Sequence, residues 1–235
     1  MSGTLESLLP LFTADDVPCT GPEEIPSPRF EPVLDERALR ATRPGGGLSR
    51  YPMLYIGEGC NTMFLLNQGK VIWSYSTGEG WEYDDIWMLS DGNIVFSRQS
   101  WAGMVTPTKR LIWRYEIGGP WAAIRLRNGN TLITAEAERR TVEVDRKGNI
   151  VWQCTLDEIP EPYRLADSQS CVRLRNGNTI LCSRGDGGRA PQLLEITPDK
   201  EVVWSVYDWD VLGSASAVQI LSDPGVPEVP GDCER

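Results

Sequence analysis

The feature of this sequence that most constrains its fold is a phrase that occurs four times. Each copy is an apolar stretch, a polar turn, and then two aliphatic residues and a tryptophan, and the four tryptophans are Trp73, Trp113, Trp152 and Trp204. The steps between these tryptophans are 40, 39 and 52 residues. A repeat of this length, built from strand-like pieces, is typical of a β-propeller or a related repeat array.

A second phrase alternates with the first. The segments 88–95, 125–132 and 173–180 read MLSDGNIV, RLRNGNTL and RLRNGNTI. Asp-Gly and Asn-Gly between apolar runs are strong hairpin signals, and we expect type I′ turns with positive φ at both central residues. Each unit then contains two hairpins, and four antiparallel strands per unit make one propeller blade.

The sequence therefore predicts an all-β fold, a β-propeller of about four blades over residues 46–235. A non-repeat N-terminal arm, residues 1–45, precedes it and is rich in proline and acidic residues, with a short helix expected at 34–41. The first unit offers strands near 53–57, 62–66 and 71–76 but no inner strand, whereas SAVQIL at 216–221 resembles the inner strand AAIRLR at 122–127. We expect strand 216–221 to pair with strand 53–57 and close the ring, because an open ring exposes sheet edges.

Composition narrows the classes of partner. The formal net charge of −10 repels phosphate backbones, so no nucleic-acid partner is expected. No apolar run is long enough to cross a membrane, and the N-terminus lacks the basic start of a secretory signal, which favours a cytoplasmic protein without a membrane partner. The six cysteines form no CxxC pair and the chain has no histidine, so a zinc site has little support and the cysteines are expected to be small buried side chains.

The segment NGNTLI followed by VEVDRKGNIVW resembles the PQQ-like, quinoprotein-type repeats that also occur in arylsulfotransferase-like proteins and in many uncharacterised bacterial propellers. The resemblance covers about residues 46–230. It implies a propeller in which six to eight blades are usual, so this chain has fewer than typical members. The resemblance does not extend to PQQ binding, because the quinone-dependent dehydrogenases are longer and carry an adjacent-cysteine pair that this chain lacks. We expect no cofactor apart from, at most, a divalent cation.

Candidate catalytic groups are few. The arylsulfotransferases use a catalytic histidine, and serine or cysteine nucleophiles are usually paired with one, so both chemistries are excluded by the absence of histidine. The carboxylates Glu82, Asp84 and Asp85 remain as weak candidates for acid–base work or for binding a hard cation. They lie just before the inner strand of the second blade, where loops are expected to surround one mouth of the channel.

Aromatic and polar residues from equivalent loops are expected at the same mouth. Aromatic faces combined with a few polar groups are typical of sites for sugars or other small ligands. The predicted ligand-binding residues are Trp81, Tyr83, Asp84, Asp85, Trp121, Gln169 and Trp209. Arg184 and Arg189 flank a Gly-rich loop and would be needed for an anionic ligand.

The sequence favours a non-catalytic propeller that binds a small ligand, such as a carbohydrate, or a protein at the channel mouth. Two alternatives stay open at this point. One is an enzyme acting on a carbohydrate or another small molecule through the mouth carboxylates. The other is a structural scaffold completed by self-association, which would make the protein a homo-oligomer.

Overall fold

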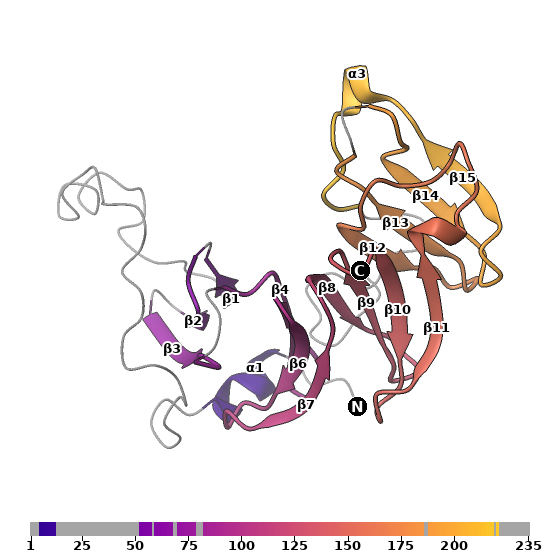
Figure 1. Cartoon of the computed structure of the whole chain (residues 1–235). Coiled ribbons are helices and arrows are strands. Elements are labelled where there is room, and N and C mark those ends of the chain that lie inside the picture. Colours follow the sequence, from indigo (N-terminus) through magenta and orange to yellow (C-terminus); the bar gives the residue numbers. More distant parts are fainter. Residues whose placement is uncertain are drawn as a thin grey trace, which may run out of the picture.

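The computed structural model of the chain describes residues 5–12, 52–57, 59–67, 70–78, 82–185, 188–218 and 220. Within these residues the strands form four antiparallel sheets, which follow one another in chain order along a curved row (Figure 1). The predicted all-β propeller class is confirmed.

Each sheet consists of strands that are consecutive in the sequence. The first sheet has three strands, and the second, third and fourth have four each. The first comprises β1 (Met53–Ile56), β2 (Met63–Asn67) and β3 (Lys70–Tyr75). The second comprises β4 (Asp85–Met88), β5 (Ile94–Arg98), β6 (Trp101–Val105) and β7 (Leu111–Glu116). The third comprises β8 (Pro120–Arg125), β9 (Thr131–Ala135), β10 (Arg140–Val144) and β11 (Ile150–Thr155). The fourth comprises β12 (Ser170–Arg173), β13 (Thr179–Cys182), β14 (Leu193–Ile196) and β15 (Val202–Val206).

The hairpin turns form where the sequence predicts them, but their type differs from the expectation. In the turn after β4, the Leu89 N–H donates to the Asn93 carbonyl and the Gly92 N–H donates to the Leu89 carbonyl. Of the turn residues Asp91 and Gly92, only Gly92 has a positive φ, of 82°. This pattern is a three-residue loop with a G1 bulge rather than a type I′ turn. Five further hairpin turns in the second to fourth sheets, those that begin at Thr106, Leu126, Asp145, Leu174 and Thr197, repeat the same pair of backbone hydrogen bonds.

Apolar side chains between successive sheets form the core. One cluster joins the first and second sheets and includes Met63, Leu65 and Trp73 on one side and Ile94 and Phe96 on the other. A second cluster runs through the second, third and fourth sheets. Each sheet thus buries apolar area mainly against its neighbours in the row, as expected for a repeat architecture.

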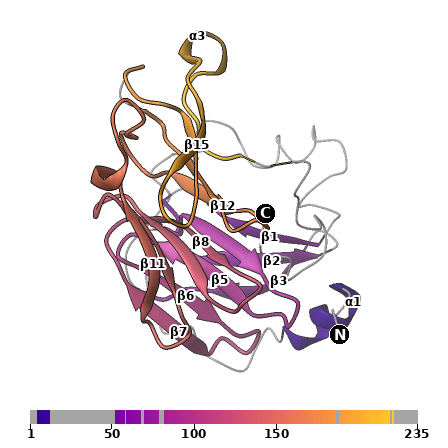
Figure 2. The ribbon, with the colours of Figure 1, turned by 90° about the vertical axis from the view of Figure 1, so that its right-hand side faces the viewer.

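A short N-terminal segment packs outside the repeat. It comprises α1 (Leu5–Leu8) and a 3-10 turn, η1 (Leu9–Leu11), and it lies beside the first sheet (Figure 2). Phe12 is buried, and its ring meets the Trp73 ring edge-on with 5.4 Å between centroids. The remainder of the predicted arm, including the helix expected at 34–41, lies outside the described residues.

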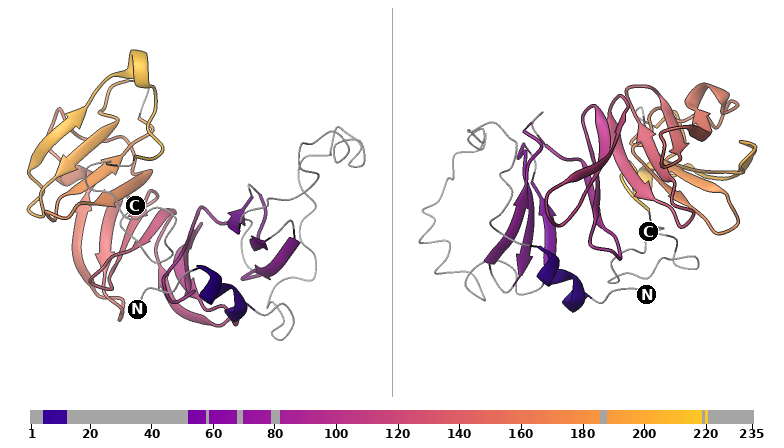
Figure 3. Two further views of the ribbon diagram at one scale, coloured as in Figure 1. Left: turned by 180° about the vertical axis from the view of Figure 1, so that it is seen from behind. Right: turned by 90° about the horizontal axis from the view of Figure 1, so that it is seen from below.

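Among the described residues, the expected ring closure is not formed. Residues 216–218 and 220 are not in a strand, and no described strand other than β2 pairs with β1. After β15 the chain passes through a helical turn, α3 (Trp209–Leu212), and the Ala215 N–H then bonds the Ser183 carbonyl of the fourth sheet. This bond keeps the segment at the fourth sheet, while the first sheet lies at the opposite end of the row (Figure 3).

Candidate functional site

Three of the predicted site residues occupy the same position in successive blades. Asp84, Trp121 and Gln169 each stand one residue before a pair in strand register: Asp85 with Ser97, Ala122 with Thr134, and Ser170 with Cys182. Because these inner strands run in the same direction and adjoin one another, the three residues lie at one rim of the row. One carboxylate oxygen of Asp85 accepts the backbone N–H of Ala123 at 3.2 Å, which links the inner strands β4 and β8.

The rim over the third and fourth blades carries a cluster of polar and aromatic groups. The Arg184 guanidinium carbon lies 4.9 Å from the centroid of the half-exposed Trp121 ring. Asp167 accepts the Arg184 backbone N–H at 2.9 Å, and its second oxygen lies 3.8 Å from Arg184 Nε. Gln169, two residues further along, has a buried side-chain oxygen that has no hydrogen-bond partner among the described residues. We call Trp121, Asp167, Gln169 and Arg184 the rim cluster.

Trp209 supports the loop that carries Arg184. Its indole N–H donates to the Ala190 carbonyl at 2.9 Å, and its ring covers Gly185, where a Cβ atom would overlap the ring. Gly185 also has a φ of 76°, so any other residue there would have a strained backbone in addition to the overlap with the Trp209 ring. Trp209 therefore packs against this loop and supports it.

The residues predicted from the second-blade loop have other surroundings. Tyr83 is buried: its hydroxyl accepts the Thr77 backbone N–H at 3.0 Å, and its ring packs edge-on against Phe96. Burial raises the pKa of Tyr83 above its usual value. Glu82 accepts the Gly59 backbone N–H at 2.7 Å and so ties the first blade to the second. Trp81 lies outside the described residues.

A buried arginine, Arg98, lies beneath this loop. Its guanidinium carbon is 4.9 Å from the Tyr83 ring centroid and 5.6 Å from the Trp101 ring centroid. One of its N–H groups donates to the Asn61 side-chain oxygen at 3.1 Å. Sequence reasoning missed these cation–π contacts because they join Arg98 on β5 to Tyr83 in the loop before β4 and to Trp101 on β6.

No metal centre is found in the part of the chain that the structure describes: no three or more cysteine, aspartate or glutamate side chains there are grouped to hold an ion. Of the cysteines in those residues, Cys154, Cys171 and Cys182 are buried and Cys60 is half-buried, and all four are free thiols. Burial raises the pKa of both Cys154 and Cys182 to about 11, so neither is an activated nucleophile. No described helix is long and apolar enough to cross a membrane.

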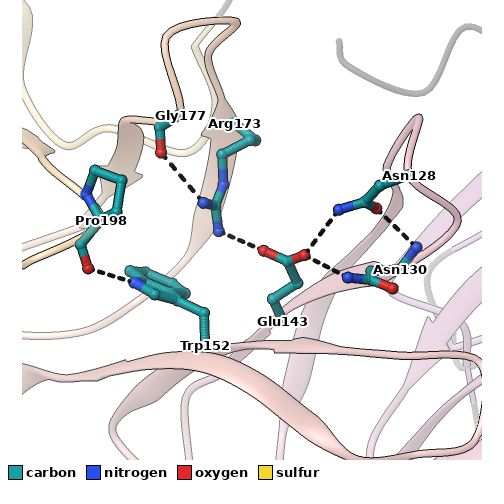
Figure 4. A network of polar contacts seen from close by, with 7 residues as sticks. All are labelled: Asn128, Asn130, Glu143, Trp152, Arg173, Gly177 and Pro198. Carbon is teal, nitrogen blue, oxygen red and sulfur yellow. Dashed lines mark hydrogen bonds and ion pairs between the residues drawn. The ribbon is translucent and has the colours of Figure 1, made fainter.

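A polar network joins the third blade to the fourth (Figure 4). Glu143 on β10 accepts the side-chain N–H groups of Asn128 and Asn130 at 3.1 and 2.6 Å through one oxygen. Its other oxygen forms an ion pair of 3.0 Å with Arg173 on β12, and both side chains are nearly buried. The Arg173 guanidinium carbon lies 4.7 Å from the centroid of the Trp152 ring. Sequence analysis did not identify this network, although the repeated RLRNGN phrase contains most of its parts.

The repeat tryptophans are part of the same blade-to-blade contact. The Trp152 indole N–H donates to the Pro198 carbonyl in the β14–β15 turn of the next blade at 2.8 Å. Trp73 makes the equivalent bond to the Pro107 carbonyl of the second blade, also at 2.8 Å. Each of these tryptophans thus anchors the outer turn of the blade that follows.

The fourth blade contains only part of this arrangement. Glu195 pairs with Trp204 in strand register, as Glu143 pairs with Trp152, and it accepts the Asn178 side-chain N–H at 2.7 Å. Among the described residues, however, no basic side chain pairs with Glu195, and Trp204 is 44% exposed.

Comparison with known proteins supports the fold. No protein-family profile matches the sequence, and no curated protein is significantly similar to it. Among solved structures, a protein of unknown function from Bacteroides caccae is similar, with a TM-score of 0.58 and 23% sequence identity over 69% of this chain and 65% of that one. BamB from Moraxella catarrhalis has a TM-score of 0.48 and 13% identity over 72% of this chain and 50% of its own. A virginiamycin B lyase from Staphylococcus aureus has a TM-score of 0.47 and 14% identity over 64% of this chain and 53% of its own.

The chain thus spans less than two thirds of the length of each of these structures. At identities below 25%, likeness of structure shows the fold and not the activity. The row of antiparallel, mostly four-stranded sheets itself identifies the fold of the described residues as a β-propeller.

Proposed function

We propose that this protein is a non-catalytic binding propeller of the PQQ-like repeat type, and that the rim cluster holds a small polar ligand. The observation that carries the proposal is the buried, unpartnered side-chain oxygen of Gln169, on the same rim as the half-exposed Trp121 ring. A buried acceptor without a donor costs free energy, and a ligand hydroxyl or N–H would offset that cost.

The chemistry of the cluster selects the class of ligand. Trp121 offers a ring face, Gln169 offers an acceptor, and Arg184 with Asp167 offers donors and an acceptor at the edge of the ring. This combination suits a neutral molecule with a flat or ring-shaped apolar face and several hydroxyl groups, such as a carbohydrate. The Arg184 side chain is 45% exposed and therefore has room to move as a ligand stacks on Trp121.

The non-catalytic part of the proposal rests on the carboxylates. Glu82 accepts a hydrogen bond from a backbone N–H of the first blade, and Asp85 accepts one from the third. Both carboxylates therefore stabilise contacts between blades. A general acid or base needs a free approach to the reacting atoms. Glu82 and Asp85 therefore favour a structural role over the enzyme alternative.

The test is a calorimetric and fluorescence titration of the full chain with a panel of neutral mono- and oligosaccharides. We expect a hit whose affinity falls at least tenfold in Gln169→Leu and in Trp121→Ala. The matched control is Gln99→Leu, an exposed glutamine in the β5–β6 turn, which should bind as the wild type does. Gln169→Leu should not lower stability, because it removes an unsatisfied buried acceptor. A panel without any binder, or a binder that tolerates Gln169→Leu, would overturn the proposal.

A further inference from the structure

The faces of the sheets define how one blade meets the next. We call the face that packs on the following sheet the outgoing face, and the face that packs on the preceding sheet the incoming face. On the incoming face of the second sheet, Ile94 and Phe96 are fully buried against the first sheet. They stand opposite Val105 and Gly103 in the register of β5 and β6.

The incoming face of the first sheet has the same pattern, but no described sheet precedes it; on this face Leu66 is buried while the β1 side chains are exposed. Met53 and Tyr55 stand opposite Leu66 and Phe64 in the register of β1 and β2. They therefore occupy the positions that Ile94 and Phe96 occupy in the second sheet. Met53 is 37% exposed and Tyr55 is 49% exposed, whereas their counterparts are 0% exposed.

The outgoing face of the fourth sheet is open in the same way. Trp204 is 44% exposed, whereas Trp73, the repeat tryptophan on the outgoing face of the first sheet, is 2% exposed. The two indoles occupy one repeat position, since Trp73 pairs with Leu65 and Trp204 with Glu195 in their sheets. Exposed side chains at positions that are buried elsewhere in the repeat mark a surface built to be covered.

We infer that these two open faces form one interface between two copies of the chain. The incoming face of the first sheet in one copy packs on the outgoing face of the fourth sheet in the other. The two faces lie at opposite ends of the curved row, so they do not meet within one chain (Figures 1 and 3). The contact continues the blade-to-blade interface already formed three times in each copy.

The symmetry of this contact predicts a closed assembly. A ring of two copies has a twofold axis, and the incoming face of each copy then meets the outgoing face of the other in two equivalent contacts. Two rows of four blades form a ring of eight, the upper end of the usual range for propellers. Each copy then contributes both open faces to two equivalent interfaces. This inference does not depend on ligand binding at the rim cluster.

Sedimentation velocity and light scattering on the full chain test the inference. We expect a wild-type mass of twice 26.2 kDa. Trp204→Lys and Tyr55→Lys, which each spoil one face, should give monomers with an unchanged far-UV circular dichroism spectrum, because both side chains are already exposed in one copy. The matched control is Val151→Lys, an exposed residue of the third sheet on neither open face, which should remain a dimer.

Mixing the two monomeric variants distinguishes this arrangement from a dimer in which one face packs on the same face of the other copy. An intact Trp204 face in one variant can meet an intact Tyr55 face in the other, so a mixture should form mixed dimers held by a single interface. A wild type that stays monomeric at 100 µM or higher, a larger or open-ended assembly, or dimers that survive both lysine substitutions would overturn the inference. So would a mixture that contains only monomers.

Discussion

The network around Glu143 yields a stability prediction with a control inside the same chain. In Glu143→Gln, Arg173 loses its anionic partner while its side chain remains only 13% exposed. The new amide also turns N–H donors toward the donors of Arg173 or of the two asparagines. Removing one partner of a fully buried ion pair costs about 3–5 kcal/mol, and the residual exposure here lowers the expected loss to about 2–3 kcal/mol. For a chain of this size that corresponds to a fall in Tm of roughly 4–12 °C.

The control is Glu195→Gln in the fourth blade. Glu195 accepts one amide N–H, from Asn178, and a glutamine oxygen can accept the same bond. We expect its loss to stay within about 0.5 kcal/mol, as for most changes without a buried partner. Urea unfolding followed by circular dichroism measures both, with Tyr55→Lys as the background so that self-association does not contribute.

A double-mutant cycle isolates the ion pair itself. The double variant Glu143→Gln with Arg173→Met no longer contains the unpaired cation. Its loss of unfolding free energy should therefore be smaller than the sum of the two single-variant losses by at least about 1 kcal/mol. Equal losses in Glu143→Gln and Glu195→Gln, or additive losses in the cycle, would refute the assignment of a stabilising clamp between the third and fourth blades.

The strands were predictable from the sequence because their signals are local. The strands expected near 53–57, 62–66 and 71–76 lie within one residue of the observed ends of β1, β2 and β3. The turn type was not predictable in the same way. Asn-Gly indicates a tight turn, but the loop length depends on which residues pair across it, and Leu126 pairs with Asn130 rather than with a nearer residue.

Ring closure and the rim depended on non-local contacts. The similarity of 216–221 to an inner strand says nothing about where α3 and the bond from Ala215 to Ser183 hold that segment. Tyr83 is an aromatic residue of the kind expected at the mouth, yet inside the protein its hydroxyl bonds Thr77 and its ring packs on Phe96. Trp121 and Gln169 could be placed on one rim from the repeat alone, because equivalent positions in a repeat occupy equivalent places. Their binding role stays a prediction.

Two further predictions follow from protonation. Raising the pKa of the Cys154 and Cys182 thiols to about 11 leaves on the order of a hundredfold less thiolate at pH 8 than an ordinary thiol has, so iodoacetamide should label both far more slowly in the native protein than in urea. Fast native labelling of either, seen by peptide mass spectrometry, would contradict this. The Lys200 ammonium, bonded to the Glu158 carboxylate across two blades, holds the pKa of Glu158 below 4.5. A depressed folded-state pKa stabilises the fold fully above the unfolded value and loses this contribution as the pH falls through the folded value. The difference in urea midpoint between wild type and Lys200→Gln should therefore be present at pH 7 and shrink as the pH is lowered below 4.5 and through the folded-state pKa of Glu158. A difference that stays equally large over this range of pH would mean that Lys200 acts through packing or turn geometry and not through its charge.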